Sequence, residues 1–183
     1  MNKSHKYRLI YLTGFMASGK STIAPILANC LGYGYYDLDA EIEKSAGKNI
    51  RAIFNEAGEP AFRGMEHAKL VEISKYTDAV ISLGGGTVLQ DANLELITST
   101  GLLIYLKADP AQLFRRLKHK KDRPILQAEN GESLSDQELR NRIETLLDKR
   151  ESCYAKADLV IQTDNKPVGK TVDEIVKQLQ KII

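Results

Sequence analysis

Short apolar segments alternate with longer amphipathic segments along most of the chain. Aliphatic and aromatic residues fill residues 7–13, 79–83 and 102–106, as is typical of strands buried on both faces. Residues 32–37 and 158–162 are shorter segments of the same kind and predict two more strands. Because helical segments separate these strands, we expect a three-layer α/β domain with a five-stranded parallel sheet.

Helical periodicity is clearest after Lys20, where apolar residues recur at the spacing of one helix face. These residues are Ile23, Ile26, Leu27, Cys30 and Leu31. We expect Cys30, which lies on this face, to belong to the core. Residues 50–54 predict a short helical turn, and Pro60 then suits the first position of a longer helix towards Ser74.

Further helices are expected at about residues 40–47, 92–98 and 110–118, and after residues 135 and 171. Asp109 is predicted to cap the helix that begins with Pro110. Ser135 and Thr171 are each followed three residues later by a glutamate, which is the capping-box pattern. Both are therefore predicted to start a helix.

Residues 14–21 match the phosphate-loop pattern G-x-x-x-x-G-K-[ST] at every fixed position, between a predicted strand and a predicted helix. Glycines allow close backbone approach, and amides at the helix N-terminus favour phosphate. Lys20 is expected to contact the β- and γ-phosphates and the Ser21 hydroxyl to bind Mg²⁺. The alternative is a glycine-rich turn without a ligand. Pattern and context together favour a nucleoside triphosphate site.

Two other groups follow predicted strands, namely Asp37 with Asp39 and the glycines at residues 84–86. Since ligands bind outside the carboxyl ends of parallel strands, both groups are expected to share a crevice with the phosphate loop. Asp37 is a candidate metal ligand, and Asp39 is a candidate to hold an acceptor hydroxyl and accept its proton. The alternatives are that the aspartates only cap the next helix and that the glycines form a flexible turn.

Arg63 lies close to Phe54 and Phe62 in sequence, and its guanidinium is suited to clamp a carboxylate through two hydrogen bonds. The simpler interpretation is an exposed helix arginine that pairs with Glu59 or Glu66. Arg150, on a later predicted helix, is far from Arg63 in sequence but able to meet it in space.

Residues 118–123 form a basic run at the start of the one irregular stretch of the chain. A weak nucleic-acid patch is one interpretation, although no aromatic residues are interleaved. We favour a lid over about residues 119–134, which would close over the phosphates, bring an arginine to the transferring group and exclude water.

The composition favours one domain over residues 1–183, because 183 residues that are 43% hydrophobic can bury a full core. A net charge of +2 gives no reason to expect a nucleic-acid partner. The two cysteines, Cys30 and Cys153, and the three histidines, His5, His67 and His119, lack metal-ligand spacing. No signal sequence or membrane span is apparent, so we expect a cytoplasmic protein without a membrane partner. Separately, we expect a monomer.

The chain resembles the shikimate kinase family from Leu12 to about Thr163. The matching stretches are residues 14–22, Asp37-Leu38-Asp39, Phe62-Arg63 with Glu66, Gly84-Gly85-Gly86, Arg123-Pro124-Ile125-Leu126 and residues 150–154. This resemblance implies a nucleoside-monophosphate-kinase-like fold with the sheet order 2-3-1-4-5. It also implies ATP-dependent phosphorylation of the 3-hydroxyl of shikimate, with Mg²⁺, in the chorismate route to aromatic amino acids.

The resemblance assigns site residues position by position. The ATP site would comprise Gly14, Ala17, Ser18, Gly19, Lys20, Ser21, Thr22, Arg116, Arg123 and Lys166. The shikimate site, centred on about residues 37–66, would comprise Asp39, Phe54, Phe62, Arg63, Gly84, Gly85, Gly86 and Arg150. Asp39 as base, Lys20 and Arg123 would be catalytic. Ser21 and Asp37 would hold Mg²⁺.

Two departures from the family pattern stand out. Ala17 replaces a glycine that is common in the family's phosphate loop, and residues 150–154 lack the proline usual between the arginine and the tyrosine. A kinase of the same fold that acts on gluconate is the nearest rival. A protein that senses nucleotides or binds nucleic acid is a rival of another class, and acceptor-dependent consumption of ATP separates it from a kinase.

Overall fold

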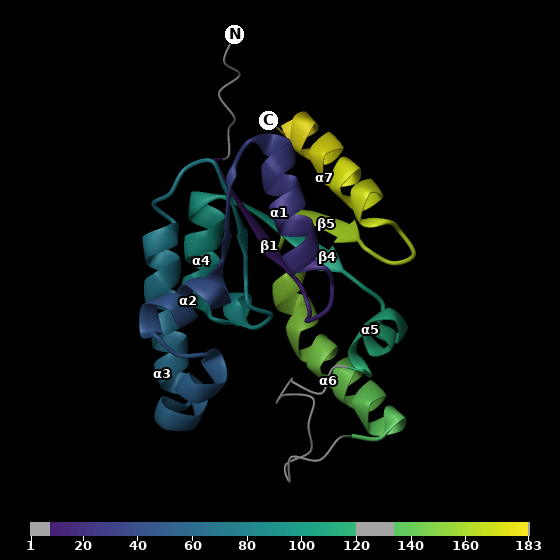
Figure 1. The fold of residues 1–183 in the computed structure, drawn as a ribbon. Coiled ribbons are helices and arrows are strands. Elements are labelled where there is room, and N and C mark those ends of the chain that lie inside the picture. Colours follow the sequence, from purple (N-terminus) through teal and green to yellow (C-terminus); the bar gives the residue numbers. More distant parts are fainter. Residues whose placement is uncertain (1–7, 120–133, 183) are drawn as a thin grey trace.

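The computed structural model describes residues 8–119 and 134–182, with a five-stranded parallel sheet at its centre (Figure 1). The strands are β1 (Leu9–Thr13), β2 (Gly34–Asp37), β3 (Ala79–Ser82), β4 (Leu102–Lys107) and β5 (Leu159–Gln162). Their order, β2-β3-β1-β4-β5, confirms the predicted order. Parallel pairing sets Leu12 beside Ser82 and Ile104, which brings the carboxyl ends of the three central strands to one edge.

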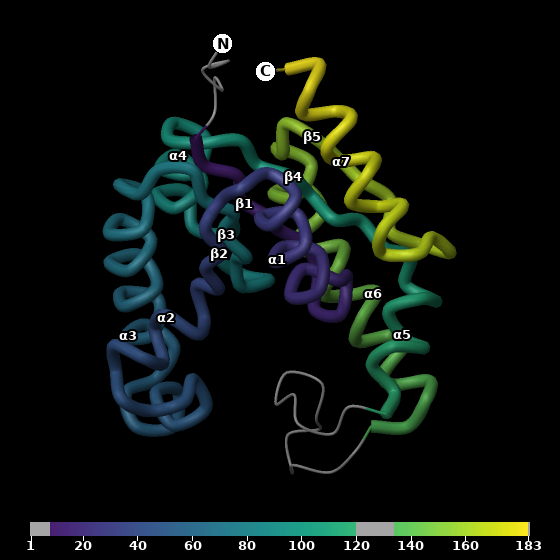
Figure 2. Tube along the Cα trace, turned by 45° about the horizontal axis from the view of Figure 1, so that its top comes forward, coloured from purple at the N-terminus to yellow at the C-terminus, as the bar shows by residue number. Residues whose placement is uncertain are grey.

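Helices cover both faces of the sheet, and α1 lies beside α7 in both views (Figures 1 and 2). The helices are α1 (Lys20–Leu31), α2 (Leu38–Ala46), α3 (Ile50–Ile73), α4 (Asp91–Thr100), α5 (Pro110–Leu117), α6 (Asp136–Tyr154) and α7 (Val168–Ile182). A short 3₁₀ helix, η1 (Thr87–Leu89), follows the glycines after β3. Every predicted strand and helix within the described residues is present.

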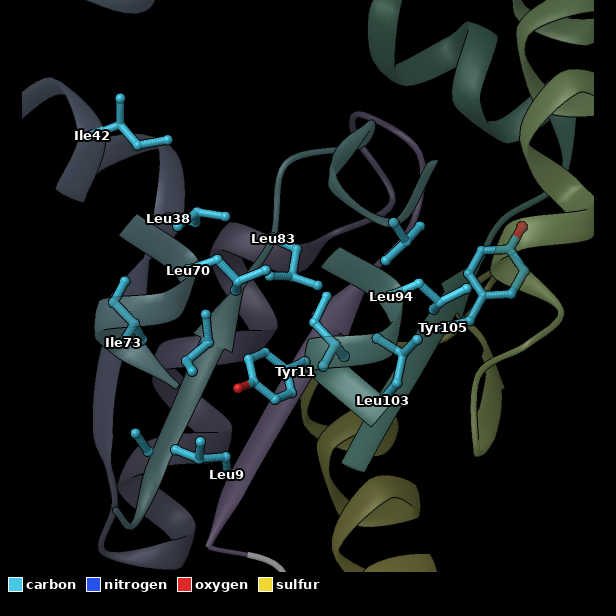
Figure 3. Close-up of a cluster of buried hydrophobic side chains, with 14 of the residues drawn as sticks. Leu9, Tyr11, Leu38, Ile42, Leu70, Ile73, Leu83, Leu94, Leu103 and Tyr105 are labelled. Carbon is cyan, nitrogen blue, oxygen red and sulfur yellow. The ribbon is translucent and has the colours of Figure 1, made fainter. Parts of the chain in front are cut away.

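Alternate residues of β1 enter two different cores. Leu9 and Tyr11 pack with side chains of α2, α3 and α4, as Figure 3 shows for part of this cluster. Ile10 and Leu12 pack with α1 and α7 on the opposite face. All five residues of β1 are buried, which explains why its sequence is continuously apolar.

The prediction that Cys30 is buried is wrong, since Cys30 is exposed. The buried face of α1 consists of Ile23, Ala24, Leu27 and Ala28. Two alanines thus occupy the buried face where the apolar spacing predicted Ile26 and Cys30, and Ile26 is 40% exposed.

A kink divides α3 at Gly58, where φ is 78° and ψ is 173°. Pro60 follows, and because proline has no N–H it cannot continue the hydrogen bonding of the preceding helix. The predicted turn at residues 50–54 and the helix that begins near Pro60 are therefore two segments that meet at this kink.

The capping box of Ser135 and Glu138 is confirmed, but two other caps are not. Asp109 occupies the N-cap position of α5, yet in the described residues its side chain makes no capping bond. Thr171 lies inside α7 because that helix begins at Val168. No helix among residues 8–119 and 134–182 is long and apolar enough to cross a membrane.

Candidate active site

A cavity of about 580 Å³ opens at the carboxyl edge of the sheet. Its walls come from the segments that follow β1, β2, β3 and β5, together with α5. They include Met16, Ala17, Ser18, Gly19, Lys20, Ser21, Thr22, Asp37, Asp39, Ser82, Gly84, Gly85, Arg116, Thr163 and Lys166. The structure thus brings the phosphate loop, both aspartates and two of the three glycines to one site, as the strand ends predict.

The phosphate loop packs too tightly for a side chain at Gly14. A Cβ there would lie 2.6 Å from the Leu106 carbonyl oxygen, and its φ of 142° suits glycine. In the described chain, no side chain caps the N-terminus of α1, which begins at Lys20. The first amides of this helix have no partner within the helix, so they suit an anion.

Two side chains of the loop are suited to bind phosphate. The Lys20 ammonium donates to the carbonyl oxygens of Gly14 (2.6 Å) and Phe15 (3.1 Å), which holds it over the loop. Ser18 is 1% exposed, and its Oγ has no hydrogen-bond partner among the described residues. A buried hydroxyl without a partner is costly, and a phosphate oxygen would satisfy it.

Ala17 adopts a φ of 62°, which lies in the left-handed region. This is the position at which the sequence departs from the glycine of the similar family. The Arg116 Nη1 donates to the Ala17 carbonyl oxygen at 2.9 Å and so ties α5 to the loop. Lys166, which also lines the cavity, forms an ion pair with Glu174 at 2.7 Å.

Asp37 caps a helix and also lies in the cavity, so the two interpretations of this residue are compatible. Its Oδ1 accepts a hydrogen bond from the Ala40 amide at 3.2 Å, which caps α2. Asp37 also lines the cavity together with Ser21. A carboxylate and a hydroxyl are hard oxygen donors, so this pair suits Mg²⁺, which binds to few protein ligands and keeps its remaining sites for water and phosphate.

The three glycines after β3 are needed because charged side chains crowd against them. A Cβ would lie 3.0 Å from Asp39 Oδ1 at Gly84 and 2.9 Å from Arg63 Nη2 at Gly86. At Gly85 it would lie 3.3 Å from Arg150 Nη1. The residues predicted for acceptor binding thus converge on this loop from three separate segments.

Arg63 forms the ion pairs of the simpler interpretation and also lies beside the glycines that follow β3. It pairs with Glu66 at 2.9 Å and with Glu59 at 3.0 Å. Burial opposes its charge, but hydrogen bonds and charges from Glu66 and Glu59 outweigh burial and raise the Arg63 pKa. Arg63 therefore stays cationic.

Arg150 is buried, with 8% exposure, although it is charged. Its Nη1 donates to the Gly85 carbonyl oxygen at 3.3 Å, and its guanidinium lies 5.6 Å from the Phe15 ring centre. Phe54 and Phe62 pack against each other at 4.6 Å, and Arg63 lies 5.3 Å from the Phe62 ring centre. Phe54, Phe62, Arg63, Gly86 and Arg150 are outside the lining of the cavity and beside it.

Arg123 and residues 120–133 of the predicted lid lie outside the described residues. Sequence reasoning missed Thr163 and Thr171, which also line the cavity. Thr163 directly follows β5, at the same edge of the sheet as the other strand ends, and this is the signal that predicts it. Thr171 lies in the first turn of α7.

A family model described as shikimate kinase matches residues 16–180. The shikimate kinase of Chlorobaculum parvum is 50% identical over 177 residues, which cover 97% of this chain and 95% of that protein. The shikimate kinase of Chlorobaculum tepidum is also 50% identical, covering 97% of this chain and 93% of that protein.

Two solved structures of shikimate kinases are also similar to this chain. Shikimate kinase from Acinetobacter baumannii in complex with shikimate has a TM-score of 0.84 at 31% identity, covering 97% of this chain and 95% of that one. Shikimate kinase from Bacteroides thetaiotaomicron has a TM-score of 0.86 at 34% identity, covering 94% and 98%. A gluconokinase from Sinorhizobium meliloti, with a TM-score of 0.57 at 18% identity over 96% and 93%, shares the fold alone.

Proposed function

Because the chain belongs to the shikimate kinase family, we propose that the cavity at the carboxyl edge of its sheet transfers the γ-phosphoryl group of ATP to shikimate. The chain is an enzyme of aromatic amino acid biosynthesis that phosphorylates shikimate. One observation carries the proposed site: a single cavity contains Lys20, Ser21, Asp39 and Gly85, which come from three strand ends.

The phosphate loop holds the nucleotide in this proposal. Its amides and the Ser18 hydroxyl bind the phosphates, and Lys20 exchanges its bonds to loop carbonyls for the β- and γ-phosphates. Ser21 and Asp37 would hold Mg²⁺, and when bound this ion would neutralise charge that develops on the phosphates. Arg116 and Lys166 lie on the side assigned to the adenine, and Arg123 stabilises the transferring group.

Asp39 is the proposed base. The acceptor oxygen at position 3 forms a bond to the γ-phosphorus as the bond to the ADP oxygen breaks, and the hydroxyl proton passes to the Asp39 carboxylate. A Cβ at Gly84 would lie only 3.0 Å from Asp39 Oδ1. The glycine at this position therefore leaves space beside the carboxylate.

Arg63 and Arg150 are the proposed clamp for the carboxylate of shikimate. Both guanidinium groups lie against the glycine loop, which offers backbone amides beside them. A planar carboxylate matches the fork of a guanidinium, which a lysine cannot reproduce. Phe54 and Phe62 form the apolar wall next to Arg63. We propose further that the chain acts as a cytoplasmic monomer.

Release of ADP from ATP and Mg²⁺ tests this function, with shikimate, gluconate or no acceptor in parallel. Release that requires shikimate is expected, and equal release with gluconate would contradict the acceptor site. Asp39→Asn should lower kcat by about 10²- to 10⁴-fold, because the amide cannot accept the proton, while ATP binding persists. A kcat near that of the unchanged enzyme would remove Asp39 as base.

A further inference from the structure

Three hydrogen bonds join α3, η1 and α4 beside the glycine loop, and the backbone between Glu66 and His67 closes them into a ring. The hydroxyl of Thr87, the first residue of η1, donates to Glu66 Oε1 at 2.7 Å. The Thr87 carbonyl oxygen accepts from Asn93 Nδ2 of α4 at 3.1 Å. Asn93 Oδ1 lies 2.7 Å from Nδ1 of His67, the next residue after Glu66 in α3. The ring thus runs from α3 through η1 and α4 and returns to α3.

The direction of each bond in the ring follows from what each group can do. A carbonyl oxygen only accepts, so the amide nitrogen of Asn93 must face Thr87 and its oxygen must face His67. His67 Nδ1 therefore carries a proton and donates it to Asn93. No position in the ring leaves two acceptors facing each other.

Burial makes this ring rigid. Glu66 is 1% exposed, and Thr87 and Asn93 are fully buried. A buried polar atom that loses its partner is costly, so each of these groups is held in one orientation. His67 is the one exposed member of the ring among these four residues.

The ring connects to the proposed carboxylate clamp at two points. Glu66 uses Oε1 for Thr87 and Oε2 for Arg63, which lies at 2.9 Å. The Thr87 amide also donates to the Gly84 carbonyl oxygen at 3.2 Å. Thr87 therefore contacts both the carboxylate that orients Arg63 and the loop against which Arg63 packs.

We propose that Thr87 is a positioning residue for the acceptor site, and that Asn93 and His67 hold it in place. It acts through Glu66, which it keeps turned so that the second oxygen meets Arg63. This inference rests on the proposed role of Arg63 as a clamp for the shikimate carboxylate. The Thr87 hydroxyl fixes the orientation of the buried Glu66 carboxylate. A side chain of the same shape without the hydroxyl therefore cannot replace threonine.

Thr87→Val and Thr87→Ser form the decisive pair, because the first keeps the shape and the second keeps the hydroxyl. Thr87→Val should raise the KM for shikimate by about five- to tenfold and leave the KM for ATP within about twofold, because a hydrogen bond to a charged group is lost. Thr87→Ser should restore the shikimate KM. Thr98→Val is the control and should leave the shikimate KM unchanged, because in the described part of the chain the Thr98 hydroxyl donates only within α4, to the Leu94 carbonyl oxygen among others.

Equal shikimate KM values for Thr87→Val and Thr87→Ser would overturn the proposal. Arg63→Ala is measured in parallel, to separate failure of the Thr87 proposal from failure of the proposed clamp. An unchanged shikimate KM in Arg63→Ala would contradict the role of Arg63 as a clamp. If Thr87→Val does not fold, Asn93→Ala provides the same test, since Thr87 then loses its anchor. A folded Asn93→Ala enzyme with an unchanged shikimate KM would also overturn the proposal.

Discussion

The hydroxyl of Tyr154 donates a 2.6 Å hydrogen bond to the carbonyl oxygen of Gly85. Arg150, one helical turn earlier in α6, donates to the same oxygen at 3.3 Å. Burial raises the pKa of the Tyr154 phenol, so it remains a neutral donor. One turn of α6 thus holds the glycine loop and presents a clamp arginine beside it.

Tyr154→Phe should raise the KM for shikimate by about three- to fivefold and lower the free energy of unfolding by about 1 kcal/mol, since one buried hydrogen bond is lost. Steady-state kinetics and urea unfolding measure the two effects. Tyr11→Phe is the matched control, because Tyr11 is equally buried and bonds to Thr100 at 2.9 Å. An equal rise of KM in both variants would show that lost stability, not the contact with Gly85, is the cause.

Gly86→Ala should raise the KM for shikimate by about tenfold, because its methyl group would displace the Arg63 guanidinium and a charged hydrogen bond to the acceptor would be lost. A Cβ at Gly86 lies 2.9 Å from Arg63 Nη2. Gly64→Ala in α3 meets no atom within 4 Å and should instead stabilise the fold by about 0.5–1 kcal/mol. Normal shikimate kinetics in Gly86→Ala would contradict the close approach.

Ala17→Gly should leave the free energy of unfolding unchanged or raise it by up to about 1.5 kcal/mol. Relief of the left-handed conformation contributes about 1–2 kcal/mol, and the greater freedom of glycine in the unfolded chain offsets about 0.5–1 kcal/mol. Gly14→Ala, which faces the Leu106 carbonyl, should cost about 2 kcal/mol. Urea unfolding compares the two variants, and a clear loss of stability in Ala17→Gly would contradict the strain at this position.

Glu138→Gln tests the cap of α6 through the pH dependence of the free energy of unfolding. Hydrogen bonds from the Ser135 hydroxyl and amide lower the pKa of the Glu138 carboxyl below its usual range. A lowered pKa in the folded state stabilises the protein above the pKa of the unfolded state, and this effect is lost as pH falls through the folded value. The unchanged protein should therefore exceed Glu138→Gln in stability at neutral pH, with a gap that closes below about pH 4.5. A gap independent of pH would contradict this.

Most of the fold is predictable because strand burial and helix periodicity leave direct signatures. The continuous apolar sequence of β1 predicts a strand buried on both faces, and the structure confirms it. Cys30 shows the limit of the same method. Its spacing fits the apolar face of α1, but Ala24 and Ala28 are buried instead, and such small side chains contribute little to a hydrophobic pattern.

The active site is predictable to the extent that its residues follow strands. The phosphate loop, Asp39 and the glycine loop converge because parallel strands end at one edge. The ring of Thr87, Asn93 and His67 could not be predicted in this way. Its bonds join segments with no shared period, and His67 has no metal-ligand spacing that would single it out.

The three glycines after β3 also limit how this enzyme can be redesigned. Each position faces a charged side chain from a different segment, namely Asp39, Arg150 and Arg63. A Cβ at any of the three positions would lie within 3.3 Å of one of these groups, so we expect most side chains introduced in this loop to disturb the acceptor site. A change of acceptor preference is therefore better sought at the charged residues, with glycine kept at residues 84–86.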